Sequence, residues 1–107
     1  MAIVINYDGE KYTLGYTRAT IRNMEKAGFN ISNIDTATVT TCEDLFAGAF
    51  LMRHRRIKAD KISEIYNHVE HKEDLIAKLA EMYYEALSTL MEEPDENDLK
   101  KATWEEE

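Results

Sequence analysis

The stretch from Lys72 to Met91 constrains the fold most, because it carries a long helical repeat of apolar residues. A helix of twenty residues is roughly 30 Å long, about the diameter of a small domain. The repeat therefore predicts a long C-terminal helix, closed by Pro94, against which the earlier elements pack. The apolar residues of this repeat are Leu75, Ile76, Leu79, Met82, Tyr83, Ala86, Leu87 and Leu90.

At 107 residues, with 44% apolar and 32% charged residues, the chain has the composition of one globular domain. No apolar run reaches the ~18 residues of a membrane span, and the N-terminus lacks the pattern of a secretory signal. The single cysteine, Cys42, excludes an internal disulfide. These features predict a cytoplasmic protein without a membrane partner.

The formal net charge of -8 is unevenly distributed along the chain. Residues 92–107 hold eight acids against Lys100 and Lys101 and so contribute -6 of this charge. We therefore predict a single globular domain over residues 1–93 and an acidic, flexible tail over residues 94–107. A nucleic-acid-binding protein would need a basic surface, so we expect no nucleic-acid partner.

Residues 2–15 are typical of a β-hairpin. The dipeptide Asp8-Gly9 suits a two-residue type I′ turn, which needs a positive φ at both central positions. With the turn placed there, the apolar residues of both strands fall on one face. The cross-strand pairs that follow are Tyr7 with Glu10, Ile5 with Tyr12, and Ile3 with Leu14.

The remaining sequence predicts helices. Thr17 is the expected N-cap of a first helix that ends near Ala27, and Gly28-Phe29 is typical of a helix C-cap. Residues 30–40 are predicted to form a loop anchored by Ile31, Ile34 and Val39. The expected class is α+β, mostly α: an N-terminal hairpin followed by about four helices packed around the long C-terminal one.

A second helix is predicted from Cys42 to about Arg56, because Thr41 and Asp44 form a variant of the capping box. Gly48 weakens this helix by about 1 kcal/mol relative to alanine, which favours a close approach of another backbone at that point. A third helix is expected from Ala59 to about Val69, followed by a bend that leads into the long helix.

Reactive groups form no recognisable catalytic or metal-binding pattern. Of the histidines, His68 and His71 are three residues apart, but they lack the further His or Cys ligands of a zinc site. Cys42, in the first turn of the expected second helix, has no neighbouring base. We therefore expect a protein that is not an enzyme and that holds no cofactor or metal.

Two features hint at a protein partner. Residues 53–61 carry a local charge of +4, which fits either a solvated helix end or a docking patch for an acidic surface, such as the tail of another copy. Tyr83 and Tyr84 are adjacent in a helix and cannot both point into the core, so a large side chain is expected on the surface.

Three segments resemble the small tail assembly chaperones of long-tailed bacteriophages and prophages of Gram-positive bacteria. These segments read YTLGYTRATIRNMEKAGFNI, LFAGAFLMRHRRIKADKISEIY and KEDLIAKLAEMYYEAL. The resemblance covers Ile3 to Met91. It implies a non-enzymatic protein that binds the tape measure protein, keeps it soluble, helps to recruit the major tail (tube) protein, and is absent from the finished virion. It also implies that a longer frameshifted form can exist, with the acidic tail as the junction.

A chaperone for a helical client needs an apolar groove, and we expect it between the second and the last helix, near Phe46, Phe50, Tyr83 and Leu87. The alternative is that these side chains only close the core. The full set of candidate partner-binding residues is Phe46, Phe50, Arg53, Arg55, Arg56, Tyr83, Tyr84 and Leu87. Self-association through the edge of the hairpin is a further hypothesis. The alternative function is a virion structural protein, such as a head–tail connector or tail completion component.

Overall fold

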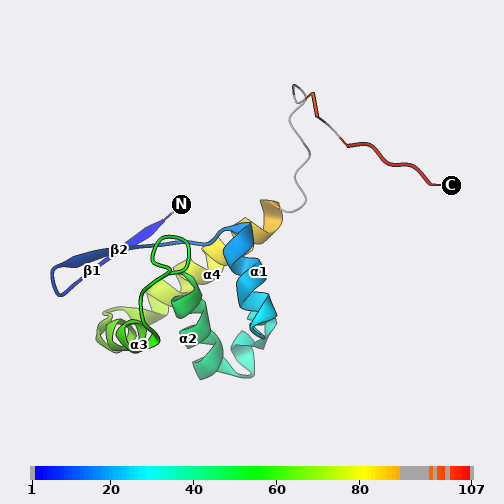
Figure 1. The fold of residues 1–107 in the computed structure, drawn as a ribbon. Helices are drawn as coiled ribbons and strands as arrows, with labels where there is room; N and C mark the ends of the chain where they lie inside the picture. The colour runs from blue at the N-terminus through cyan, green and yellow to red at the C-terminus, as the bar shows by residue number, and fades with distance from the viewer. Residues whose placement is uncertain (1, 90–96, 98, 101, 107) are drawn as a thin grey trace.

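The computed structural model describes residues 2–89, 97, 99–100 and 102–106. A β-hairpin is followed by helices, which confirms the α+β, mostly α class (Figure 1). The elements in chain order are β1 (Ile3–Tyr7), β2 (Glu10–Leu14), α1 (Arg18–Lys26), the 3-10 helix η1 (Ile31–Asp35), α2 (Thr38–Gly48), α3 (Ala59–His68) and α4 (Lys72–Ser88).

The hairpin has the predicted register, with Tyr7 opposite Glu10, Ile5 opposite Tyr12 and Ile3 opposite Leu14. Asp8 and Gly9 have φ angles of 50° and 79°, as a type I′ turn requires. The alternation also holds, because Ile3, Ile5 and Tyr7 are half-buried while Val4 and Asn6 are exposed. Turn chemistry and side-chain pattern therefore agree with the structure.

The caps of α1 are those that the sequence predicts. The Thr17 hydroxyl accepts from the Thr20 N–H at 3.1 Å, and the Thr17 N–H donates to the Thr20 hydroxyl at 2.9 Å, which closes a capping box. At the other end, Gly28 has a φ of 101° and the Phe29 N–H donates to Met24 C=O at 2.9 Å. This bond is typical of a Schellman cap and directs Phe29 towards the core.

The predicted start of the second helix is wrong. Residues 30–40, expected to be a loop, contain η1 and the first residues of α2, and Val39 is 72% exposed instead of anchoring the chain. Thr41 lies inside α2 and not at its N-cap. Its side chain is buried and donates to Asn33 C=O at 3.4 Å. Contact with η1 therefore replaces the capping role that the local sequence indicates.

The predicted end near Arg56 is also wrong, because α2 ends at Gly48. In a continued helix, Ala49 C=O would accept from the Arg53 N–H. Instead it accepts from the N–H of Gly15, just after β2, at 3.0 Å. The hairpin therefore takes the acceptor that a longer helix would need, and residues 49–53 form turns closed mostly by hydrogen bonds between residues three apart.

The third and fourth helices start as predicted. The expectation that every other helix packs around the last one is wrong, because α2 contacts η1, α1, α3 and α4, whereas α4 packs mainly against α1 and α2. Its residues Leu79, Met82 and Tyr83 are buried against the other helices. The predicted continuation to Met91, the stop at Pro94 and the boundary between residues 93 and 94 lie outside the described residues. The buried apolar residues are Leu14, Ile21, Met24, Leu45, Phe46, Ala49, Phe50, Ile65, Leu79, Met82 and Tyr83.

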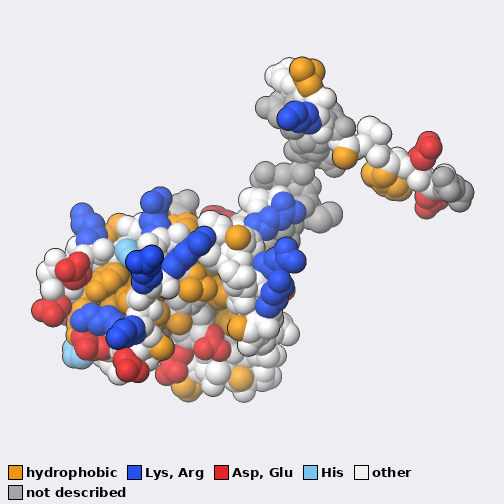
Figure 2. Space-filling model, viewed as in Figure 1, with side chains coloured by type: hydrophobic (Ala, Val, Ile, Leu, Met, Phe, Trp, Pro, Cys, Tyr) orange, Lys and Arg blue, Asp and Glu red, His pale blue; other side chains and the backbone are white. Residues whose placement is uncertain are grey.

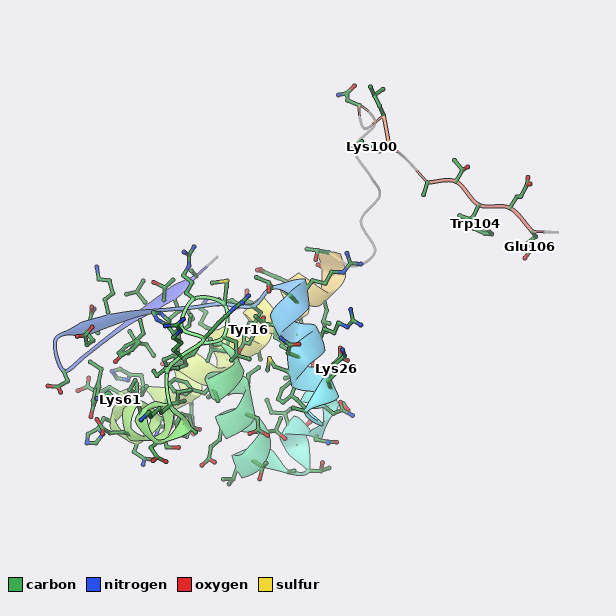
Figure 3. The ribbon with its side chains drawn as sticks, viewed as in Figure 1. Tyr16, Lys26, Lys61, Lys100, Trp104 and Glu106 are labelled. Carbon is green, nitrogen blue, oxygen red and sulfur yellow. The ribbon has the colours of Figure 1, made fainter. Side chains whose placement is uncertain are left out.

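The described part of the tail is exposed. Trp104 has 87% of its surface in solvent and lies on a trace that leads away from the helices (Figure 3). Among the described helices, none has both the length and the hydropathy to cross a membrane.

Candidate functional site

Three of the predicted partner-binding side chains are in the core. Phe46 and Phe50 have no exposed surface, and Tyr83 has 2%. The rings of Phe46 and Phe50 meet edge to face at 5.2 Å, and Tyr83 meets Phe29 in the same way at 5.4 Å. These side chains therefore fill the space where a groove between α2 and α4 was expected. They close the core, which was the alternative interpretation of the sequence.

The two other candidates on α4 lie nearer the surface. Tyr84 is 53% exposed, which confirms that Tyr83 and Tyr84 point in different directions. Leu87 is half-buried and lines a depression of about 210 Å³ between α1 and α4, beside Ile21 and Arg22. These side chains are not part of one patch with the arginines predicted to bind a partner.

Arg53, Arg55 and Arg56 are exposed on the segment between α2 and α3, which we call the basic loop (residues 53–58). None of the three forms an ion pair within the described part of the chain. Lys58 is also exposed, and Figure 2 shows Lys and Arg side chains on the face where this loop lies. Because α2 ends earlier than predicted, these charges do not cap a helix and are available to an acidic partner.

His54 holds the basic loop against the hairpin. Its Nε2 accepts a hydrogen bond from the Thr13 N–H at 2.9 Å, and its ring meets that of Tyr12 at 5.4 Å. The arginines on both sides of His54 therefore point outward from a loop that is tied down at its centre.

An apolar depression of about 340 Å³ adjoins the basic loop, between the ends of α1 and α2 and the start of α3. A second depression of about 420 Å³ shares Asp44, Ala47, Ala59 and Ile62 with it and continues between α2 and α3. We call the two together the α2–α3 groove. Its partly exposed large apolar side chains are Phe29, Leu51, Ile57, Ile62 and Tyr66, and the buried Met24 and Phe46 also line it.

Small residues create this groove. Ala47 and Gly48 on α2 and Ala59 on α3 line it, so neither helix fills the space between them. The close approach that Gly48 predicts is present, but it comes from a side chain and not from a backbone. A Cβ added at Gly48 would overlap Sδ and Cε of Met24.

The charges around the α2–α3 groove are of both signs. Glu43 and Asp44 line it on the α2 side and are exposed. The basic loop adjoins its other end, where Leu51 and Ile57 flank the arginines in sequence. An apolar floor with charged borders can hold one face of an amphipathic segment and orient it by charge.

A polar cluster fixes the tip of the hairpin to α3. The Tyr7 hydroxyl donates to Glu64 Oε2 at 2.8 Å, and Lys61 Nζ donates to the same oxygen at 3.3 Å. The hydrogen bond from Tyr7 lowers the pKa of Glu64, and the same bond raises the pKa of Tyr7. His68 Nδ1 lies 2.8 Å from the Glu64 carbonyl oxygen. This exposed network holds two elements together.

Cys42 is not an activated thiol. It lies beyond the first turn of α2, and partial burial raises its pKa. Within the residues that the structure describes, no three His, Cys, Asp or Glu side chains are grouped as metal ligands.

A family model described as a domain of unknown function (DUF5055) matches residues 1–106. The chain belongs to the DUF5055 family. The DUF5055 match includes the hairpin, the described helices, the α2–α3 groove and the basic loop. No curated protein and no solved structure matches the chain significantly.

Proposed function

We propose that this chain is a tail assembly chaperone of a bacteriophage or prophage. It would bind a helical segment of the tape measure protein in the host cytoplasm, act without catalysis, and bring tube subunits to that client. The resemblance of residues 3–91 to such chaperones supports this proposal. The observation that carries it is the α2–α3 groove, an apolar surface that the fold leaves uncovered beside exposed arginines.

The groove suits a client helix on physical grounds. An amphipathic helix binds by laying its apolar face into a hydrophobic groove, with anchor residues at steps of three and four. The floor from Leu51 to Tyr66 offers aliphatic and aromatic contacts for such anchors. The basic loop is placed to pair with acidic residues at one end of the client segment, and the net charge of -8 would help to keep the coated client in solution.

Co-expression with the tape measure protein of the same phage tests the proposal. The wild-type chain should keep the client soluble and co-purify with it. Ala59→Glu places a carboxylate in the groove at an exposed position in the first turn of α3, where negative charge favours the helix. We expect this variant to reduce recovery of the complex at least tenfold, because the charge must then be buried against an apolar client.

Ala19→Glu is the matched control, since Ala19 is an exposed alanine in the first turn of α1 that does not line the groove. It should bind the client like the wild type. An insoluble client in the presence of the wild-type chain would refute the chaperone function. Equal binding by both variants would remove the groove from the mechanism. Detection of the chain in purified virions by mass spectrometry would instead favour a structural component.

A further inference from the structure

The two edges of the hairpin differ in their hydrogen bonding. Tyr7 and Glu10 flank the two-residue turn and form a hydrogen-bonded pair, so the main-chain groups of the next pair along, Asn6 and Lys11, point out of the sheet. The same alternation turns the groups of Val4 and Thr13 outward. The hydrogen bond from the Thr13 N–H to His54, outside the hairpin, agrees with this alternation.

The β2 edge is covered by the chain itself at Thr13 and Gly15. Thr13 N–H donates to His54, and Gly15 N–H donates to Ala49 C=O. On the β1 edge, the outward N–H and C=O groups of Val4 and Asn6 have no hydrogen-bond partner within the described part of the chain. Figure 1 shows the hairpin extending past the helices at its turn, so this edge is not closed off there.

Nothing in the sequence of β1 protects its edge. The strand IVINY has no charged residue, no proline and no bulge, which are the usual devices that prevent edge pairing. A hollow of about 310 Å³ lies beside it, lined by Ile5, Asn6 and Tyr7 and by residues of α3 and the bend after it. There is therefore space next to the strand as well as unpaired main-chain groups along it.

We propose that β1 pairs with β1 of a second copy, antiparallel and centred on Ile5, so that the two hairpins form one sheet of four strands. In this register Val4 faces Asn6 of the second copy, and Asn6 faces Val4 of the second copy. Every outward N–H and C=O group of these residues then meets a partner.

The side chains favour a second copy as the occupant. The same register places Ile3 opposite Tyr7 of the second copy and Ile5 opposite Ile5, all on the half-buried apolar face. Asp8 falls opposite Ala2, so no like charges meet across the two-fold axis. Two strands alone are marginal in water, whereas a wider sheet with an apolar face is stable, so the pairing also strengthens each hairpin.

Light scattering after size exclusion tests this pairing. The wild-type chain should have twice the monomer mass of 12.4 kDa. Asn6→Pro removes an outward N–H from the β1 edge and no bond within the hairpin, so it should give a monomer. Lys11→Pro is the matched control, because it removes an outward N–H from the opposite edge and should remain a dimer. A monomeric wild-type chain, or equal dissociation of both proline variants, would overturn the proposal.

Cysteine cross-linking in a Cys42→Ser background tests the register without relying on proline. Paired Ile5 residues would lie opposite each other with their Cα atoms about 4.5 Å apart, within disulfide range. Ile5→Cys should therefore oxidise readily to a disulfide-linked dimer. The two Val4 residues would be roughly 8 Å apart, too far for a disulfide, so Val4→Cys is the control. Equal cross-linking at both positions, or none at Ile5→Cys, would contradict the pairing.

Discussion

Replacing Tyr16 with phenylalanine should destabilise the fold through one hydrogen bond at the end of α2. In the last turn of this helix, the Ala49 N–H bonds to Phe46 C=O at 3.2 Å and not to Leu45 C=O. The Leu45 carbonyl instead accepts from the Tyr16 hydroxyl at 2.7 Å. Burial raises the pKa of Tyr16, so its hydroxyl stays protonated and remains a donor throughout the neutral range.

The size of the effect follows from what phenylalanine leaves behind. The ring can keep its edge-to-face contact with Tyr83, at 5.4 Å between centroids, so little packing is lost. The Leu45 carbonyl loses the Tyr16 donor in a partly buried position, which costs about 1–3 kcal/mol. For a domain of this size, that corresponds to a fall in the melting temperature of roughly 4–20 °C. Urea unfolding followed by circular dichroism would measure the free energy directly.

Tyr84→Phe is the matched control, because Tyr84 is 53% exposed and its hydroxyl has no hydrogen-bond partner in the described part of the chain. It should change the free energy of unfolding by less than about 0.5 kcal/mol. Should Tyr16→Phe cost no more than this control, Leu45 C=O must be satisfied in another way, and Tyr16 would not stabilise the end of α2.

Three further results are expected. The hairpin should loosen in acid, because the hydrogen bonds from Tyr7 and Lys61 lower the folded-state pKa of Glu64. The contribution of Glu64 is then present above about pH 4.3 and is lost as the pH falls through the folded value, which hydrogen exchange would show. Tyr7→Phe should reduce this pH dependence, because it removes the largest of these effects. Gly48→Ala should fail to gain the roughly 1 kcal/mol that alanine contributes in a helix, because the added methyl overlaps Met24, and a double-mutant cycle with Met24→Ala should restore part of that gain. Gly9→Ala should cost about 1–2 kcal/mol in thermal unfolding, because its φ is 79°.

The parts of the fold that were predictable from the sequence are set by neighbouring residues. The hairpin register follows from Asp8-Gly9 and the alternation on either side, and both ends of α1 follow from Thr17 and Gly28. In each case the residues that determine the geometry lie within a few positions of it. The start and end of α3 and the start of α4 are predictable for the same reason.

The ends of α2 were not predictable, because distant contacts decide them. Helix α2 begins before Thr41, the predicted N-cap, because the Thr41 hydroxyl donates to the Asn33 carbonyl of η1 instead of capping the helix. Its last turn stops where Gly15 takes the carbonyl of Ala49. Gly15 and Ala49 are 34 positions apart in sequence, so no local pattern can show that the helix ends at this point. The true end places Phe50 in the core and the arginines on a loop.

The same error explains why the candidate groove was expected between the wrong pair of helices. A helix continued to Arg56 would place Leu51 on one of its faces and Ile57 just after its end. It would also place Phe46 and Phe50 on the face expected to line the groove with the last helix. Because α2 stops at Gly48, Leu51 and Ile57 lie beside Ala59 at the start of α3 instead. The sequence does show small residues at Ala47 and Gly48, but it cannot show which helix faces them. The position of the groove therefore depends on the same contact between Gly15 and Ala49 that ends α2, and a substitution that lengthened the helix should remove the groove together with the basic loop.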